Sequence, residues 1–312
     1  MKQVKPAPPS ISASTSTCPI KAAAPSFSPS TSALASTCPQ NTEALEIELL
    51  LDALYRAHEY DFRGYARPSL TRRLARAREH FGCRSYSQLQ DLLLHEPTAL
   101  PTLLGYLTVQ VSEMFRDPGY FRALRQEVVP HLKTYPSLKV WVAGCGAGEE
   151  LYSLAILFRE EGLEDRTVFY ATDIDRDALK QAEAGIYGSD RLALFTMNHR
   201  RSGAKGSLSE YYHAGSRAVV FDRTLRKRTV FAEHNLASDA VFAEAHLISC
   251  RNVLIYFDRP LQNRAIGLFT EALVRKGFLG LGDKETVRFT GYDETFESFV
   301  SKERIYRKRG KL

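Results

Sequence analysis

The spacing of hydrophobic positions changes along the chain near Pro136. Between Glu43 and about Leu132, apolar residues recur every three or four positions, which predicts amphipathic helices. Beyond Pro136, short runs rich in β-branched and aromatic residues predict buried strands, and helical spacing returns between them. We therefore expect a helical domain over residues 43–134 and an α/β domain with a doubly wound sheet over residues 135–312.

Capping residues bound the helices of the first half. One helix begins after Pro68, which suits a first helical turn, and ends at Gly82. Leu70, Leu74 and Ala77 share its apolar face. Further helices are expected over residues 87–95, 101–110 and 120–129.

Runs of β-forming residues predict the strands of the second half. The main sheet is expected to contain residues 140–143, 167–172, 246–250, 277–282 and, as an edge strand, 305–306. Residues 185–205 are expected to be irregular. Two further runs, 218–221 and 228–231, are expected to belong to a small antiparallel insertion at about 208–233, outside the main sheet.

The first 42 residues have the composition of a disordered tail. They are mostly Ser, Thr, Ala and Pro, with Lys2, Lys5 and Lys21 and no acidic residue, so they cannot bury enough apolar surface to offset chain entropy. These lysines supply half of the formal net charge of +6. The rest of the chain is only mildly basic, and we expect no nucleic-acid partner.

Cysteine usage and hydropathy indicate the compartment. The five cysteines form no CxxC pair, which favours a reducing cytosol. No apolar run approaches the roughly 18 residues that span a bilayer, and the first residues lack the basic-then-apolar order of a signal peptide. We expect a cytoplasmic protein without membrane insertion, in which Cys145 and Cys250 are packing residues.

A glycine-rich turn follows the first predicted strand. Gly144, Gly146 and Gly148 lead from this strand into a helix, as in a nucleotide-binding crossover. The dinucleotide pattern GxGxxG fails because Glu149 stands where its third glycine would be, and no Gly-Lys-Ser/Thr follows. Glu149 and Glu150 would repel a pyrophosphate but not a nucleoside with a cationic tail. S-adenosylmethionine, with its sulfonium and ammonium groups, is such a ligand.

An acidic residue ends the next predicted strand. Asp173 follows residues 167–172 and lies about 20 to 30 residues beyond the glycines, where a carboxylate accepts hydrogen bonds from ribose hydroxyls. Asp175 is expected to cap the helix that comes after it.

The helix that begins after Pro68 also carries a cluster of arginines. Arg72, Arg73 and Arg76 are expected to project away from its apolar face. The cluster is either a solvated surface or a docking site for an acidic partner, protein or nucleic acid.

Five motifs, in this order, resemble the CheR family of chemotaxis receptor methyltransferases. They are VSEMFRDP, which contains Arg116, then AGCGAGEE, TDID, HNL and CRNVLIYF. The resemblance covers about residues 43–306. It implies a Rossmann-like class I methyltransferase sheet with an N-terminal all-helical domain and a small antiparallel β-subdomain. It also implies methyl transfer from S-adenosylmethionine to glutamate side chains on the cytoplasmic helices of chemoreceptors (methyl-accepting chemotaxis proteins), with S-adenosylhomocysteine as product.

The same resemblance assigns site residues. Arg116 and Tyr256 match the pair at the transfer centre, and Asn235 and Leu236 would border the adenine. Gln110 stands where the family often has a shorter Asn. The full set expected to bind the donor is Gln110, Ser112, Arg116, Gly144, Glu150, Asp173, Asn235, Leu236, Arg251 and Asn252.

The reaction demands few catalytic groups. A glutamate carboxylate, with an ordinary pKa of about 4.3, is ionised near neutrality and attacks the sulfonium methyl group without a general base. We therefore expect no metal and no Ser-His-Asp set. Arg116 could orient the acceptor carboxylate through its two-pronged donor geometry. Tyr256 could place its hydroxyl near the methyl group, and Glu150 could hold the ammonium of the donor.

Two other function classes remain alternatives. One is a receptor-binding module of the same fold with weak catalysis or none. The other is a methyltransferase for nucleic acid or a small molecule. Against a nucleic-acid enzyme, the Arg-Asn-Val-Leu-Ile stretch contains neither an Asn/Asp-Pro-Pro-Tyr/Phe motif nor a cysteine nucleophile. The oligomeric state is not predicted.

The small insertion bears on receptor recognition. Members of the family that grip a pentapeptide at the receptor C-terminus carry a longer, glycine-containing loop there. Between Tyr212 and Val219 the loop is short, so we expect little or no pentapeptide binding. The acidic receptor bundle would instead meet the helix that carries Arg72, Arg73 and Arg76.

Overall fold

The computed structural model describes residues 39–108 and 112–310, which belong to one compact unit, Pro39–Leu312. The predictions for Gln110 and for most of the N-terminal tail lie outside the described residues. Helix α1 (Pro39–His58) begins at Pro39, ahead of the predicted domain boundary at residue 43.

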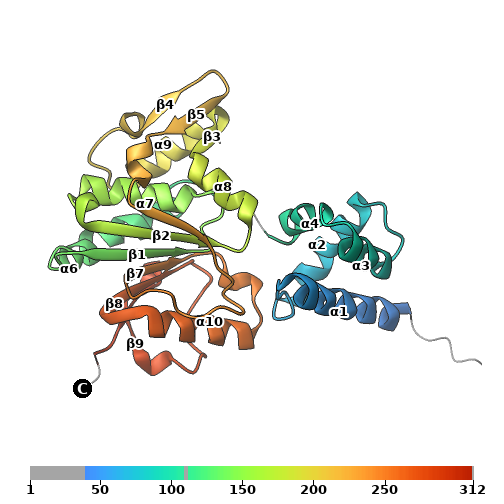
Figure 1. The fold of residues 1–312 in the computed structure, drawn as a ribbon. Helices are drawn as coiled ribbons and strands as arrows, with labels where there is room; N and C mark the ends of the chain where they lie inside the picture. Colours follow the sequence, from blue (N-terminus) through green and yellow to red (C-terminus); the bar gives the residue numbers. More distant parts are fainter. Residues whose placement is uncertain (1–38, 109–111, 311–312) are drawn as a thin grey trace, which may run out of the picture. The chain divides into compact units, whose positions relative to one another are not determined.

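The helical half contains α1, α2 (Arg67–His80), α3 (Tyr86–His95) and α4 (Ala99–Leu107) (Figure 1). Pro68 lies in the first turn of α2, and Gly82, at φ +65°, follows its C-terminal end. The side chain of Ser85 accepts a hydrogen bond from the N–H of Gln88 and thereby caps α3. The predicted helices are confirmed, with small shifts at their ends.

A mixed sheet forms the centre of the second half. Within the described residues its strand order is β6-β2-β1-β7-β8-β10-β9, and β6, β2, β1, β7 and β8 run parallel. Their bounds are β1 (Leu138–Ala143), β2 (Thr167–Asp173), β6 (Thr229–Glu233), β7 (Ala245–Cys250), β8 (Leu273–Leu281), β9 (Phe296–Val300) and β10 (Ile305–Lys308). The doubly wound sheet is thus confirmed.

Two strand predictions are wrong in their placement. Residues 228–231 do not belong to the small insertion, because β6 pairs in parallel with β2, with Thr229 opposite Phe169. Strand β10 is not an edge strand, because it lies between β8 and β9. In both cases the local residue pattern indicates a strand but carries no information about which neighbour pairs with it.

Apolar side chains cover both faces of the sheet. Along β1, Trp141 and Ala143 point into one core and Val140 and Val142 into the other, as alternation along a strand requires. Helix α10 (Arg259–Ala272) packs in the first core; α7 (Glu149–Glu160) packs in the second with α5 (Pro118–Ala123), the π-helical turn Leu124–Val128 and α6 (Val129–Leu132).

The small antiparallel sheet has the strand order β3-β5-β4. It comprises β3 (Ile186–Gly188), β4 (Tyr212–Ala214) and β5 (Ala218–Phe221). The insertion therefore starts near residue 186 rather than 208. The stretch 185–205, expected to be irregular, contains β3 and helix α9 (Leu192–Arg201).

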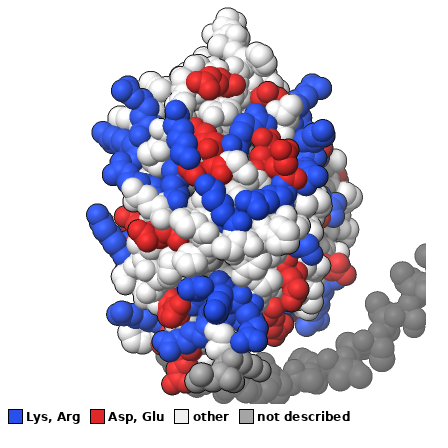
Figure 2. All heavy atoms as spheres, turned by 90° about the vertical axis from the view of Figure 1, so that its left-hand side faces the viewer, with Lys and Arg blue, Asp and Glu red and all other residues white. Residues whose placement is uncertain are grey.

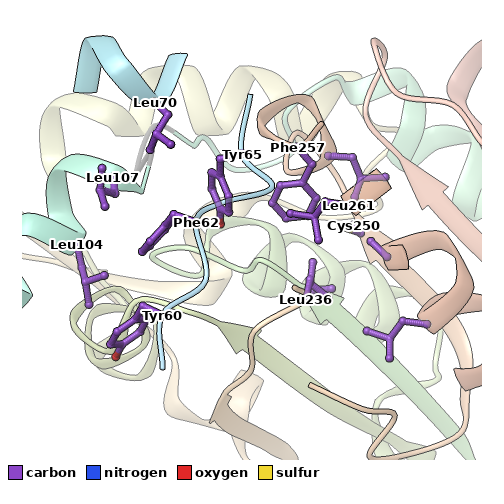
Figure 3. Close-up of a cluster of buried hydrophobic side chains, with 14 of the residues drawn as sticks. Tyr60, Phe62, Tyr65, Leu70, Leu104, Leu107, Leu236, Cys250, Phe257 and Leu261 are labelled. Carbon is purple, nitrogen blue, oxygen red and sulfur yellow. The ribbon is translucent and has the colours of Figure 1, made fainter. Parts of the chain in front are cut away.

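The helical half and the sheet share a hydrophobic core. Figure 3 shows Tyr60, Phe62 and Tyr65 in one cluster with Phe257 and Leu261. Backbone bonds join the same segments: the Ala66 N–H donates to the Tyr256 carbonyl at 2.8 Å, and the Asp258 N–H donates to the Gly64 carbonyl at 2.8 Å. Consequently the residues after β7 are fixed in part by the helical half.

Candidate active site

A cavity lies at the carboxyl edge of the parallel strands, where doubly wound sheets bind their ligands. Every predicted site residue that the structure describes lines it: Ser112, Arg116, Gly144, Glu150, Asp173, Asn235, Leu236, Arg251, Asn252 and Tyr256. The cavity thus brings together predicted site residues from five separate segments of the chain, and their individual roles remain predictions.

The glycine turn after β1 lets the backbone approach the cavity closely. Gly144 has a φ of +71°, and a Cβ atom there would lie 2.5 Å from the side chain of Val253. The N–H groups of Gly144 and Cys145 donate to the Thr172 carbonyl at 2.8 and 2.9 Å. These bonds hold the turn against the end of β2.

Asp173 is held in place by backbone donors. Its Oδ2 accepts from the Gly146 N–H at 2.8 Å, and its Oδ1 accepts from the Asp175 N–H at 3.0 Å. Burial raises the pKa of this carboxyl above its ordinary value, and the two backbone bonds oppose that shift. Asp175 caps α8 (Arg176–Ala184), as predicted.

Glu150 is oriented by a chain of hydroxyl groups and by Arg251. The Ser249 hydroxyl donates to Glu150 Oε1 at 2.5 Å and lies 2.8 Å from the Tyr120 hydroxyl. Arg251 Nη1 donates to Glu150 Oε2 at 3.2 Å. Ser249 and Tyr120 are not among the site residues predicted from the sequence, because each resembles an ordinary core residue in its segment.

Arg251 connects β7 to the segment that carries Arg116. Its Nη2 donates to Asp117 Oδ2 at 2.8 Å and to the Arg116 carbonyl at 3.0 Å, and its guanidinium lies 4.2 Å from the ring centroid of Tyr120. Phe115 and Asp117, which flank Arg116, have φ values of 51° and 56°. Non-glycine residues adopt this left-handed region at an energetic cost, and such residues cluster at functional sites.

Asn235, which lines the cavity, offers a donor without an acceptor among the described residues. Its Oδ1 accepts from the Ala237 N–H at 2.9 Å. Its Nδ2 is buried, and among the described residues no group accepts a hydrogen bond from it. A ring nitrogen of an adenine is the kind of acceptor that would satisfy this donor.

Arg73 does not belong to a surface cluster, contrary to the prediction. It is 7% exposed, donates to the Leu107 carbonyl and to Ser69 Oγ, and lines the cavity with its guanidinium 5.0 Å from the ring centroid of Tyr256. Arg72 and Arg76 are exposed. An α-helix has 3.6 residues per turn, so residues three or four positions apart lie on the same face. Arg73 therefore lies on the same face of α2 as the buried Leu70.

A second arginine absent from the predicted set joins the insertion to the site. Arg191 Nη1 donates to Glu149 Oε1 at 2.8 Å, and its Nη2 donates to the Ser112 carbonyl. Glu149 is 1% exposed. This ion pair ties the start of α7 to the segment that leads into Arg116.

Two cysteines lie in buried positions at or near the carboxyl edge of the sheet. Cys145 and Cys250 are buried, and desolvation raises the pKa of both thiols well above the ordinary value, so they stay neutral. No helix of the described ranges is long and apolar enough to cross a membrane.

Two family models match the chain. Residues 110–305 match the CheR methyltransferase SAM-binding domain, and residues 45–108 match the CheR methyltransferase all-alpha domain. The Cher3 protein of Pseudomonas putida is 50% identical over 272 residues, which are 87% of this chain and 99% of that protein. The chemotaxis protein methyltransferase of Listeria innocua is 32% identical over 190 residues, which are 60% of this chain and 70% of that protein.

Among solved structures, the chain is similar to part of the N-methyltransferase NodS of Bradyrhizobium japonicum in complex with S-adenosyl-L-homocysteine. The similarity covers 55% of this chain and 62% of that chain, with 16% identity and a TM-score of 0.31. The SAM-binding model begins at residue 110, ahead of the domain boundary expected at residue 135.

Proposed function

Because the chain belongs to the CheR methyltransferase family, we propose that it transfers a methyl group from S-adenosylmethionine to glutamate side-chain carboxylates of chemoreceptors. The product would be a glutamate methyl ester that serves sensory adaptation. The observation that carries the proposal is the cavity that Arg116 and Tyr256 line together with the residues expected to bind the donor. The fold is that of the family, an all-helical domain and a Rossmann-like class I methyltransferase domain.

Three groups in the cavity fit the methyl donor. Glu150 presents a carboxylate that would attract the donor's ammonium group, and Asp173 presents one that can accept from ribose hydroxyls. The buried Nδ2 of Asn235 provides a donor for the adenine. No phosphate is needed to satisfy any of them, which supports a nucleoside ligand with a cationic tail.

In the proposed methyl transfer, the ligand supplies the reactive group and the protein orients the reacting atoms. When bound, S-adenosylmethionine supplies a methyl group on a cationic sulfur; the acceptor carboxylate oxygen forms the new C–O bond as the C–S bond breaks. Because the carboxylate is already ionised near neutrality, the protein needs no general base. Arg116 would orient the acceptor carboxylate, and Tyr256 would place its hydroxyl at the reacting atoms. The rate would then come mainly from alignment in a water-poor cavity.

The acceptor would be the acidic helical bundle in the cytoplasmic part of a chemoreceptor, and we place the protein in the cytoplasm for that reason. Arg72 and Arg76 on α2 are exposed and available for an acidic surface. Arg73 is excluded from this docking surface by its burial.

A nucleic-acid substrate has less support. Figure 2 shows one face of the molecule, on which Lys and Arg side chains alternate with Asp and Glu. That face lacks the continuous basic surface typical of nucleic-acid binding.

The test is incubation of the protein with donor carrying a labelled methyl group and with membranes from the same cells. We expect label on receptor polypeptides as base-labile methyl esters, and much less with the Arg116→Ala variant. Label in nucleic acid or in small molecules would contradict the proposal. Tight binding to the receptors without transfer would instead identify a binding module of the same fold.

A further inference from the structure

Glu285 is a buried carboxylate outside every motif of the sequence. It lies four residues beyond the end of β8 and is 4% exposed. Its Oε2 accepts from the N–H groups of Gly282 at 2.6 Å and Asn252 at 2.9 Å, and its Oε1 accepts from the Ile255 N–H at 3.2 Å. Burying a carboxylate is costly unless hydrogen bonds compensate it, and here backbone groups provide them.

Two of these three bonds go to the loop that follows β7. This loop carries Arg251, which binds Glu150, and ends in the short 3₁₀ helix Leu254–Tyr256. Asn252 has a φ of 62°, a conformation that is uncommon for a residue with a side chain. The carboxylate therefore holds the loop at Asn252 and again immediately before Tyr256.

The close approach of β8 to this loop depends on a glycine. A Cβ atom at Gly282 would lie 2.8 Å from Glu285 Oε2 and 2.9 Å from the Asn252 backbone nitrogen. Both contacts are too short for a side chain. A glycine at this position thus allows the carboxylate to reach between two backbone segments.

We propose that Glu285 is a positioning residue for methyl transfer: it fixes the backbone at Asn252 and Ile255 and so sets where Tyr256 lies relative to the donor. The inference rests on the proposed function of the cavity, in which Tyr256 acts at the transfer centre. Desolvation raises the pKa of Glu285 and its backbone bonds oppose that shift, as is usual for a carboxylate enclosed by N–H donors.

The decisive variant is Glu285→Gln, which keeps the shape of the side chain but replaces one accepting oxygen with an amide nitrogen. We expect kcat for receptor methylation to fall by about tenfold to a hundredfold, the loss typical of small misplacements of a catalytic group. Affinity for S-adenosylhomocysteine should fall by a much smaller factor than kcat, because Glu150 and Asp173 keep their own partners and only the contact at Asn252 is loosened. Amide hydrogen exchange of peptides covering residues 251–257 should accelerate.

Asp283→Asn is the matched control, since it removes a negative charge two residues away at an exposed position. It should leave transfer, donor affinity and exchange unchanged. Gly282→Ala is the second variant, and it should reproduce the Glu285→Gln pattern because its methyl group separates the carboxylate from Asn252. It also serves as the test if Glu285→Gln does not fold.

The proposal is overturned if Glu285→Gln, or Gly282→Ala in its place, transfers methyl groups at the wild-type rate. It is equally overturned if donor affinity and kcat fall together, because that pattern indicates a general structural role. If the wild-type protein methylates no receptor, the proposed function fails. Hydrogen exchange of residues 251–257 then still decides whether Glu285 holds the loop.

Discussion

At the scale of single residues, both carboxylates expected to bind the donor are held in place by other groups of the protein. Glu150 is held by Ser249 and Arg251, and Asp173 by the backbone of Gly146 and Asp175. Such preorganisation reduces the reorientation required on binding and at the transition state.

Asp173→Ala should weaken S-adenosylmethionine binding by about 1.5 to 3 kcal/mol, the value of a hydrogen bond to a charged group. Calorimetry measures this directly, and unchanged affinity would remove Asp173 from the donor site. Since burial raises the pKa of Asp173, the carboxylate takes up its proton at a higher pH than an ordinary aspartate. Donor affinity of the wild type should accordingly begin to fall at that higher pH as the solution is acidified, and in Asp173→Ala this component should vanish.

Tyr256→Phe and Arg116→Ala should separate chemistry from binding. If both side chains act at the transfer centre, each variant should lower kcat far more than it lowers donor affinity. The measurements are receptor methylation at saturating donor and calorimetry with S-adenosylhomocysteine. Parallel losses in the two quantities would make them ordinary binding residues.

At the scale of elements, α2 serves two purposes on its two faces. Leu70, Leu74 and Arg73 face the interior, where Arg73 lies over the ring of Tyr256. Arg72 and Arg76 face the solvent. One helix thus connects the proposed docking surface with the cavity.

Replacing both Arg72 and Arg76 with glutamate should abolish receptor methylation and leave donor binding intact. The reason is that docking between a basic helix and an acidic bundle is electrostatic, so wild-type methylation should also decline as salt rises. Reversal at Arg200 and Arg201, exposed on α9, changes the net charge equally and is the matched control. A normal rate in the Arg72/Arg76 variant would place recognition elsewhere.

The small sheet should not bind a receptor tail. The turn between β4 and β5 spans only residues 215–217, so it provides little backbone for gripping an extended peptide. A pentapeptide from the receptor C-terminus should show no binding at micromolar concentration by calorimetry. Micromolar binding would assign the small sheet a tethering role after all.

At the scale of the whole molecule, the described residues belong to one compact unit, in which the helical half and the sheet share a hydrophobic core. Polar contacts add to it: the Tyr60 hydroxyl donates to Glu233 Oε1 at 2.8 Å, and Thr108 Oγ1 donates to Asp175 Oδ2 at 2.9 Å. Burial, together with Glu233, raises the pKa of Tyr60 to about 12, so this donor keeps its proton at physiological pH.

Donor binding should therefore stabilise both halves together. S-adenosylhomocysteine at about 100 times its Kd adds about 2.7 kcal/mol of stability, which corresponds to a rise in Tm of about 5 °C for a protein of this size. Scanning calorimetry should show a single transition that moves as a whole. Two transitions, of which only one shifts, would show that the halves unfold independently.

The sequence by itself determined most of the architecture. Helical spacing, capping residues and β-forming runs are local signals, and they placed the helices α2 and α3 and the strands β1, β2 and β7 close to their observed bounds. The glycine turn, with Glu149 in the third glycine position, excluded a dinucleotide and pointed to a cationic nucleoside. These features depend on residues near one another in the chain, and for that reason they can be read without the structure.

Only the tertiary structure decided how distant segments meet. Strand pairing placed β6 in the main sheet and β10 inside it, because register depends on partners far away in sequence. Arg73 was expected on the surface, but it is buried against α4 and Tyr256 and lines the cavity. Glu285, in an unremarkable polar loop, became the support of the loop after β7 through its bonds to Asn252 and Ile255. The chemistry of a side chain follows from its residue type, but the groups that it contacts depend on how the whole chain folds.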